Sequence, residues 1–187
     1  TVFGLSFMTL FSATLVAKDR ESALLQRLYT TPLTGPDFIL GYLLPLLPIA
    51  LGQTAFCYLA AIPLGLTVSA NIVYAVLGIL PMAIFNIALG LLCGSIFDVR
   101  QVGGLCGALL TNLSAWLSGV WFDLKLVGGF FEKLANALPF VHAAELGKAL
   151  FAGDFQAAWP HLLPVLLYSG LSTAIAVFCF LGQMKKQ

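Results

Sequence analysis

Charged residues are scarce in this chain, and their scarcity excludes a water-soluble fold. Only 9% of the 187 residues are Asp, Glu, Lys or Arg, whereas 60% are hydrophobic. The mean hydropathy of +0.98 exceeds what a water-soluble surface tolerates, because such surfaces rarely expose large contiguous apolar patches. The net charge is only +1, which gives no reason to expect nucleic acid as a partner.

Several motifs are missing from the sequence. The four cysteines stand singly in apolar runs, without C-x-x-C or paired His spacing, so neither a metal site nor a disulfide framework is indicated and we interpret them as small packing residues. There is no Gly-x-x-x-x-Gly-Lys-Ser/Thr loop, since Gly147-Lys148 is followed by Ala, and the chain therefore lacks a P-loop for ATP. Strand alternation is also absent, so the fold class is all-α: a polytopic helical membrane protein.

Long apolar runs are what the sequence does contain. Crossing the hydrocarbon core takes about 20 residues at about 1.5 Å each. Five stretches predict transmembrane helices, the first of them clipped at its start: 1–17, 38–66, 71–97, 102–122 and 161–182. The short connection 67–70 makes its two helices antiparallel neighbours. Kinks are expected at Pro45, Pro48, Pro63 and Pro81.

The placement of Lys and Arg predicts the orientation of these spans. Cytoplasmic loops are enriched in basic residues, and one side collects Lys18, Arg20, Arg27, Arg100, Lys185 and Lys186. The stretch after the first span and the C-terminus should therefore be cytoplasmic, in a bacterial cytoplasmic membrane. Thr1 would then face outward without an initiator Met, which leads us to expect an earlier span before it.

The segment 125–158 is expected to form a helical hairpin on the outer side. Its apolar part is interrupted by charged residues such as Glu132 and Lys133, and each charge at the centre of a span costs about 2.5–3.5 kcal/mol. We therefore expect two short amphipathic helices that meet near Pro139 and dip into the outer leaflet without crossing it.

A polar stretch, residues 18–33, separates the first two apolar runs. It predicts a short amphipathic helix over 20–29 at the cytoplasmic surface, ended before Pro32. Thr34 and Asp37 form a capping pattern for the next helix. The helix has one apolar face, made by Leu24, Leu25 and Leu28. On these residues alone it could be an ordinary interfacial helix of a cytoplasmic loop.

This stretch resembles the coupling region of membrane subunits of type 2 ATP-binding cassette (ABC) exporters, whose usual pattern is Glu-x-Gly-Thr-Leu-Glu-x-Leu-x-x-Thr-Pro-Leu. The matching residues are Glu21, Leu25, Leu28, Thr31, Pro32 and Leu33, while Ala23, Leu24 and Gln26 depart from the pattern. Further along, Ser118-Gly119, Phe122, Leu138-Pro139 and Glu145 resemble the outer hairpin of that family before its last helix. The resemblance covers the second to sixth spans of the family.

The resemblance implies a transport subunit that is not itself an enzyme. It would pair with a second permease copy or a paralogue, contact membrane lipid and rest on a cytoplasmic P-loop ATPase. ATP and magnesium would bind to that ATPase, whose hydrolysis would move a hydrophobic or amphipathic substrate outward. The residues expected at the ATPase interface are Arg20, Glu21, Leu24, Leu25, Arg27, Leu28, Thr31 and Pro32.

Other residues carry weaker expectations. The polar residues Gln53, Asn86 and Asn112 lie inside apolar spans, so each should form an interhelical hydrogen bond or contact the transport pathway. Two glycine pairs at GxxxG spacing predict close helix packing: Gly90 with Gly94, and Gly103 with Gly107. Asp98 and Arg100 are either solvated anchors or a second ATPase contact.

Two other functions fit the sequence less well. An ion-coupled secondary transporter is weakened by the lack of a membrane-embedded carboxylate. An intramembrane hydrolase would use a Gly-x-Ser-Gly motif, but Trp116 stands where that motif has its first Gly before Ser118.

Overall fold

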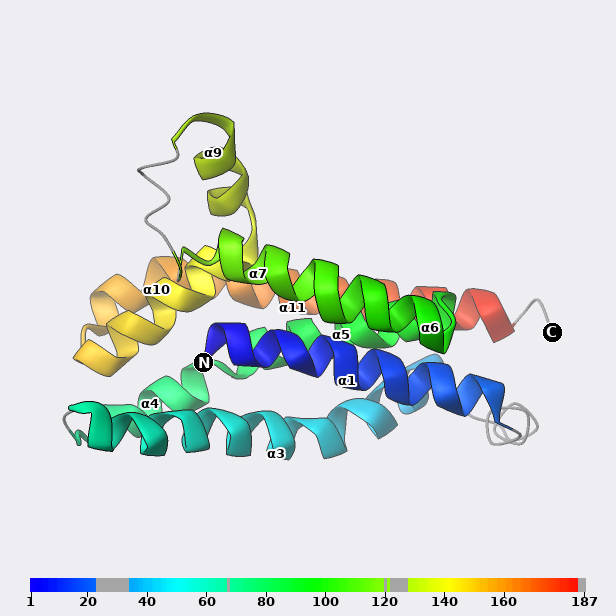
Figure 1. Cartoon of the computed structure of the whole chain (residues 1–187), viewed down its shortest axis with the longest axis horizontal. Coiled ribbons are helices and arrows are strands. Elements are labelled where there is room, and N and C mark those ends of the chain that lie inside the picture. Colours follow the sequence, from blue (N-terminus) through cyan, green and yellow to red (C-terminus); the bar gives the residue numbers. More distant parts are fainter. Residues whose placement is uncertain (23–33, 67, 120, 122–127, 185–187) are drawn as a thin grey trace.

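The computed structural model describes residues 1–22, 34–66, 68–119, 121 and 128–184, and no strand occurs among them (Figure 1). The elements, in chain order, are α1 (Val2–Glu21), α3 (Gly35–Ala61), the 3₁₀ turn η1 (Ile62–Leu64), α4 (Asn71–Gly78), α5 (Leu80–Ile96), α6 (Val99–Val102), the π-helix η2 (Gly103–Leu110), α7 (Thr111–Leu117), α9 (Gly129–Ala137), α10 (Pro139–Ala152) and α11 (Phe155–Met184).

The long helices lie side by side along one axis, and within the described part of the chain four helical stretches are long and apolar enough to cross a membrane (Figure 1). They are Val2–Glu21, Gly35–Leu64, Asn71–Ile96 and Phe155–Gly182. This confirms the all-α polytopic fold. The predicted span 102–122 is not among the four, because α6, η2 and α7 follow one another there as three short elements. The middle element, η2, is a π-helix, and the side-chain hydroxyl of Thr111 just after it donates to the carbonyl of Cys106 at 2.9 Å.

α1 and α11 extend well beyond the predicted boundaries. α1 continues past residue 17 to Glu21, so it includes the start of the predicted coupling helix. α11 begins at Phe155 and not at residue 161. Asp154 caps it by accepting the Ala157 N–H at 3.0 Å, and Pro160 lies inside the helix without ending it.

Two of the four prolines at which kinks are expected lie at the ends of helices. Pro63 lies in η1, where α3 ends, and Pro81 lies at the start of α5, just after the break between α4 and α5 at Ile79. Pro45 and Pro48 lie inside α3, which remains one helix. The kinks expected at Pro45 and Pro48 stay a prediction.

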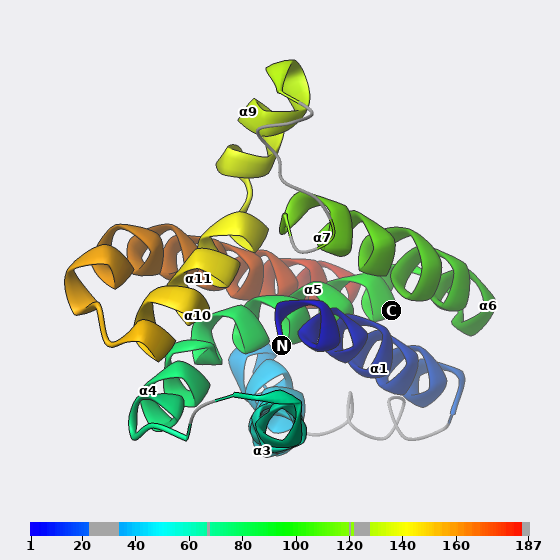
Figure 2. The ribbon, with the colours of Figure 1, turned by 60° about the vertical axis from the view of Figure 1, so that its left-hand side comes forward.

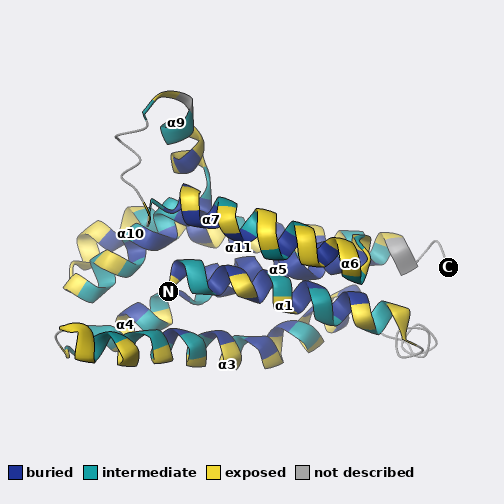
Figure 3. Cartoon of the chain, viewed as in Figure 1, coloured by how far each residue is buried: buried dark blue, intermediate teal, exposed yellow. Residues whose placement is uncertain are grey.

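The core of the bundle is centred on α5, which contacts α1 and α11 on different sides. Met82, Ile87 and Leu91 of α5 are almost completely buried. Figure 3 shows buried residues on the facing sides of the helices and exposed residues on their outer sides. The exposed sides of α3 and α11 carry large apolar side chains such as Phe56 and Phe178, as expected for surfaces in contact with lipid.

Two helices, α9 and α10, meet at Leu138–Pro139, where the sequence predicts a break. α9 projects from the bundle, whereas α10 lies against it (Figures 1 and 2). α10 contacts α4 and α11, and Phe140 meets Phe85 of α5 edge to face with ring centroids 5.9 Å apart. The position of this hairpin in the outer leaflet stays a prediction.

Candidate functional site

The candidate functional site is the end of the bundle where α1 ends and α3 begins, since the predicted coupling helix over 20–29 connects them. Residues 23–33 lie outside the described residues, and with them most of the predicted ATPase contacts: Leu24, Leu25, Arg27, Leu28, Thr31 and Pro32. The structure does place the helices on both sides of this segment.

The last turn of α1 is bonded to α3. The Tyr42 hydroxyl of α3 donates to Oδ2 of Asp19 on α1 at 2.6 Å. A hydrogen bond to a carboxylate is stronger than one between neutral groups. The Tyr42 ring also lies against Phe38, with centroids 4.7 Å apart. The end of α1 and the first turns of α3 are therefore held together.

The same turn of α1 is bonded to the end of α5. Nη1 of Arg20 donates to the carbonyl oxygens of Gly94 at 3.0 Å and Ser95 at 2.5 Å. The last carbonyls of a helix have no partner within it and carry partial negative charge, so a guanidinium is well placed there. Arg20 was expected at the ATPase interface, but its guanidinium points into the bundle. Glu21 is exposed at the end of α1.

The start of α3 is capped and packed against the end of α11. The backbone N–H and the hydroxyl of Thr34 both donate to Oδ2 of Asp37, at 3.1 and 2.5 Å, which confirms the predicted capping pattern. Phe38 stacks on Phe180 of α11 with centroids 3.7 Å apart and an interplanar angle of 10°.

These contacts join four helices around the coupling segment. We call the set the coupling frame and define it as Asp19, Arg20, Phe38, Tyr42 and Phe180. Through it, α1, α3, α5 and α11 are connected at one end of the bundle. A displacement applied between residues 22 and 34 would move α1 and α3, and the other two helices with them.

α1 and α5 pack at very short distance along a seam of small residues. A β-carbon at Gly90 would overlap the backbone of Thr9 and the side chain of Ser12, and one at Gly94 would overlap the backbone of Ala13. The predicted seam at Gly90 and Gly94 is confirmed. A β-carbon at Gly103 would meet no atom within 4 Å, so the prediction of a second seam is wrong for Gly103 within this chain.

Polar groups accompany this seam. The Thr9 hydroxyl lies 3.0 Å from the backbone carbonyl of Asn86 and 3.1 Å from its Oδ1, and Asn86 donates to the carbonyl of Met82 at 2.9 Å. The Ser12 hydroxyl lies 3.2 Å from the Ile87 carbonyl of α5. Asn86 is only 1% exposed, and its Oδ1 accepts from the hydroxyl of Thr9 on α1. Of its two predicted roles, it therefore has the interhelical hydrogen bond.

The other two polar candidates have different surroundings. Gln53 of α3 donates to the Gly4 carbonyl of α1 at 2.8 Å, but its Oε1 is buried without a hydrogen-bond partner among the described residues. Asn112 is exposed and donates to the carbonyl of Ala108 in its own helix at 2.6 Å. Gln53 thus retains a buried acceptor, and Asn112 faces the outside of the bundle.

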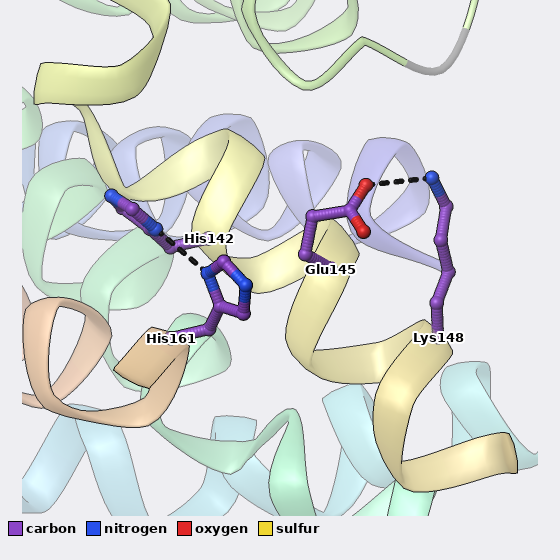
Figure 4. Close-up of polar contacts among 4 residues, drawn as sticks. All are labelled: His142, Glu145, Lys148 and His161. Atoms are coloured by element: carbon purple, nitrogen blue, oxygen red, sulfur yellow. Dashed lines mark hydrogen bonds and ion pairs between the residues drawn. The ribbon is translucent and has the colours of Figure 1, made fainter. Parts of the chain in front are cut away.

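A histidine pair joins α10 to α11 (Figure 4). Nδ1 of His142 on α10 is 3.0 Å from Nδ1 of His161 on α11, and Nε2 of His142 is 3.0 Å from the Asn136 carbonyl. A carbonyl only accepts, so Nε2 of His142 donates to it, its Nδ1 accepts, and Nδ1 of His161 donates. The pair therefore links the hairpin to α11. No group of three or more metal-ligating side chains occurs within the described ranges.

Comparison with known proteins identifies the chain. A model of the ABC-2 type transporter family matches residues 1–151. The chain belongs to the ABC-2 type transporter family. No curated protein and no solved structure matches it. The matched residues include the whole coupling frame except Phe180. Membership of this family favours a transport component, an ABC-type permease subunit, over a secondary transporter or an intramembrane hydrolase.

Sequence reasoning did not identify two features of this ABC-2 permease. The hydrogen bonds of Asp19 and Arg20 to other helices were missed. A charged residue in the last turn of a membrane helix is a general sign that another helix supplies a hydrogen-bond partner. The histidine pair joins residues 19 positions apart in the sequence, and no local spacing indicates it.

A charged turn of the permease has a local role. Asp98 is the N-cap of α6, and its backbone N–H donates to Oε1 of Gln101 at 3.3 Å. Asp98 and Arg100 are both exposed. Capping accounts for Asp98, and a second ATPase contact at this turn stays a prediction.

Proposed function

We propose that this ABC-2 permease subunit exports a hydrophobic or amphipathic substrate, driven by ATP hydrolysis on a separate cytoplasmic P-loop ATPase. The observation that carries the proposal is the coupling frame. It joins four helices at the end of the bundle where the predicted coupling segment begins and ends. A segment that receives force from a partner needs such rigid connections on both sides.

In this proposal the coupling helix binds a groove of the ATPase, in the cytoplasm. Its apolar face and the Thr31-Pro32 turn supply the contact, together with Glu21 at the exposed end of α1. Arg20 acts within the permease, since its guanidinium is bonded to the end of α5. When the ATPase closes, the coupling helix moves α1 and α3 as a body, and the bonds of Asp19 and Arg20 pass that movement to the rest of the bundle. ATP and magnesium stay on the ATPase.

The double change Leu25→Asp and Leu28→Asp tests the proposal. It places charges on the predicted apolar face, and we expect loss of ATPase copurification and of substrate-stimulated ATP hydrolysis while membrane insertion is retained. The matched control is Gln26→Asp, which adds a charge to the predicted polar face and should preserve both. Intact coupling in the double variant, or substrate transport in vesicles without ATP, would show the proposal to be wrong.

We also propose that two copies pack through the outer face of α6, η2 and α7. Four exposed residues recur there at a spacing of four: Gly104, Ala108, Asn112 and Trp116. Small residues allow close helix approach, and an amide that faces hydrocarbon is unfavourable unless it finds a partner. A second copy supplies both a close-fitting surface and a partner for Asn112.

Asn112→Leu tests this face. Interhelical polar contacts in membranes are worth about 0.6 to 2 kcal/mol, so the dimerisation constant in liposomes should fall by about 3- to 30-fold, as measured by energy transfer between labelled copies. Ala60→Leu changes an exposed position of α3 and serves as the control. Unchanged dimerisation in the Asn112 variant would place the dimer contact elsewhere.

A further inference from the structure

The last carbonyls of α9 are bonded to side chains of α10 and α11. Nε2 of His142 on α10 donates to the Asn136 carbonyl at 3.0 Å, and the Tyr168 hydroxyl of α11 donates to the Ala137 carbonyl at 2.5 Å. The last carbonyls of a helix have no partner within it and carry partial negative charge. These two donors therefore help to fix the direction in which α9 leaves the bundle.

The chain at both ends of α9 has the features of a hinge. Gly128 and Gly129 have φ values of 60° and 61°, a region of backbone conformation that glycine enters most readily. A β-carbon at Gly129 would meet no atom of the described residues within 4 Å. At its other end α9 stops before Pro139, and the helix projects from the bundle (Figure 2). α9 is therefore able to turn as a unit when its last carbonyls are released.

The number of protons on the histidine pair decides whether its two rings stay bonded. Nδ1 of His161 donates to Nδ1 of His142 across 3.0 Å (Figure 4). Nε2 of His161 has no hydrogen bond among the described residues, so it is open to a first proton, and a charged His161 still donates to His142. A second proton has to attach to Nδ1 of His142, since its Nε2 already carries the hydrogen that is bonded to Asn136. The two rings then present N–H groups to each other and repel.

We propose that His142 and His161 form an acid-sensitive latch for α9. The latch is closed when the pair is neutral or carries one added proton, and it opens when both rings are charged. The imidazolium of His142 then moves away from His161, and its Nε2–H leaves the Asn136 carbonyl. Phe131 and Ala135 of α9 also pack against the core, so opening shifts a population of α9 positions. The latch goes beyond the proposed export activity and does not depend on it.

The charges around the pair do not cancel this repulsion. The carboxylate of Glu145 on α10 favours positive charge on His161, but less strongly than the charge of His142 opposes it, and it is also 2.8 Å from Nζ of Lys148. The ring centroids of the two histidines are only 5.3 Å apart. α9 and the start of α11 contribute three more charged residues: Glu132, Lys133 and Asp154. Helices α4, α5 and α7 have no Asp, Glu, Lys or Arg, and the charges of α1 and α3 lie at the ends of those helices that form the coupling frame.

The test follows the position of α9 in the full-length permease in liposomes. Spin labels on unnatural amino acids at Lys133 and Leu167, both exposed, report the distance between α9 and α11. We expect a population with a longer distance to rise about tenfold on acidification from about pH 8 to about pH 4, because the hydrogen bond from His142 to Asn136 is lost. A second pair of labels, at Ala60 on α3 and Leu167, should keep its distance, which excludes unfolding of the bundle.

Two variants separate the latch from other acid effects. His161→Gln keeps every carboxylate but removes one of the two charged rings, so α9 should stay in place over the same pH range. Glu145→Gln should retain the opening but shift it to lower pH, because a negative charge beside the pair is lost. In the parent, isotope-labelled histidine should show a magnetic coupling between the two Nδ1 atoms at neutral pH that disappears with the opening.

Any of three results overturns the proposal. They are a constant distance between positions 133 and 167 down to about pH 4 in the parent, the same acid opening in His161→Gln, and two imidazoles that titrate independently without coupling. Should His161→Gln fail to fold, the pH titration of the parent and of Glu145→Gln still decides.

Discussion

Replacing Gly90 with Ala should force α1 and α5 apart. A β-carbon at this position would overlap the Thr9 backbone and the Ser12 hydroxyl, and would lie 3.0 Å from Cα of Thr9. The side chain of Ser12 can rotate, but the backbone of α1 cannot give way locally. The two helices therefore have to separate along this seam.

The magnitude follows from three contributions. Overpacking costs about 1–3 kcal/mol. Separation also weakens two interhelical hydrogen bonds, one from the Thr9 hydroxyl and one from the Ser12 hydroxyl, each worth about 0.6 kcal/mol in a membrane. Alanine returns up to about 1 kcal/mol through its helix propensity. The net loss is about 1–3 kcal/mol, which corresponds to a fall in Tm of about 2–12 °C for a domain of this size.

The native cysteines provide the assay. Cys93 and Cys106 are free and buried, and they belong to the cluster that packs α1 against α5 and η2. With the half-buried Cys57 and Cys179 replaced by Ser in parent and variants, a thiol-reactive dye therefore reports unfolding of this part of the purified permease on heating. Gly170→Ala is the control, since position 170 is exposed and a β-carbon there meets nothing within 4 Å. If Gly90→Ala unfolds at or above the parent temperature, the close contact does not exist.

Three further predictions concern the polar residues. Arg20→Ala should lower the free energy of unfolding by about 1–2 kcal/mol and reduce transport per ATP hydrolysed, with Arg100→Ala neutral in both; unaltered transport stoichiometry would remove Arg20 from the coupling frame. Gln53→Leu should change the free energy of unfolding by less than about 1 kcal/mol, because it removes one interhelical bond and one unpaired buried oxygen together. Transport by this variant should fall if Gln53 contacts the pathway, and normal transport would exclude it. His142→Phe should lower stability by about 1–2 kcal/mol and speed hydrogen exchange in α9, and equal exchange in parent and variant would contradict the link through Asn136.

Local features of the sequence determined the fold class and several helix ends. Long apolar runs in a bilayer must satisfy their backbone groups within each segment, which requires helices. The cap formed by Thr34 and Asp37 and the break at Pro139 involve neighbours in the chain, so the residue types suffice to predict them. The end of α1 was harder to predict, because its last turn is held by residues of other helices.

The tertiary structure alone decided which residues meet. Gly90 and Gly103 share the same spacing motif, yet only Gly90 faces another helix of this chain, because the rotation of each helix about its axis is set by packing. Arg20 reaches carbonyls 74 and 75 positions away, and His142 reaches His161 across the turn between α10 and α11. The sequence determines that these groups need partners in a medium without water, and the packing of the bundle determines which partners they have.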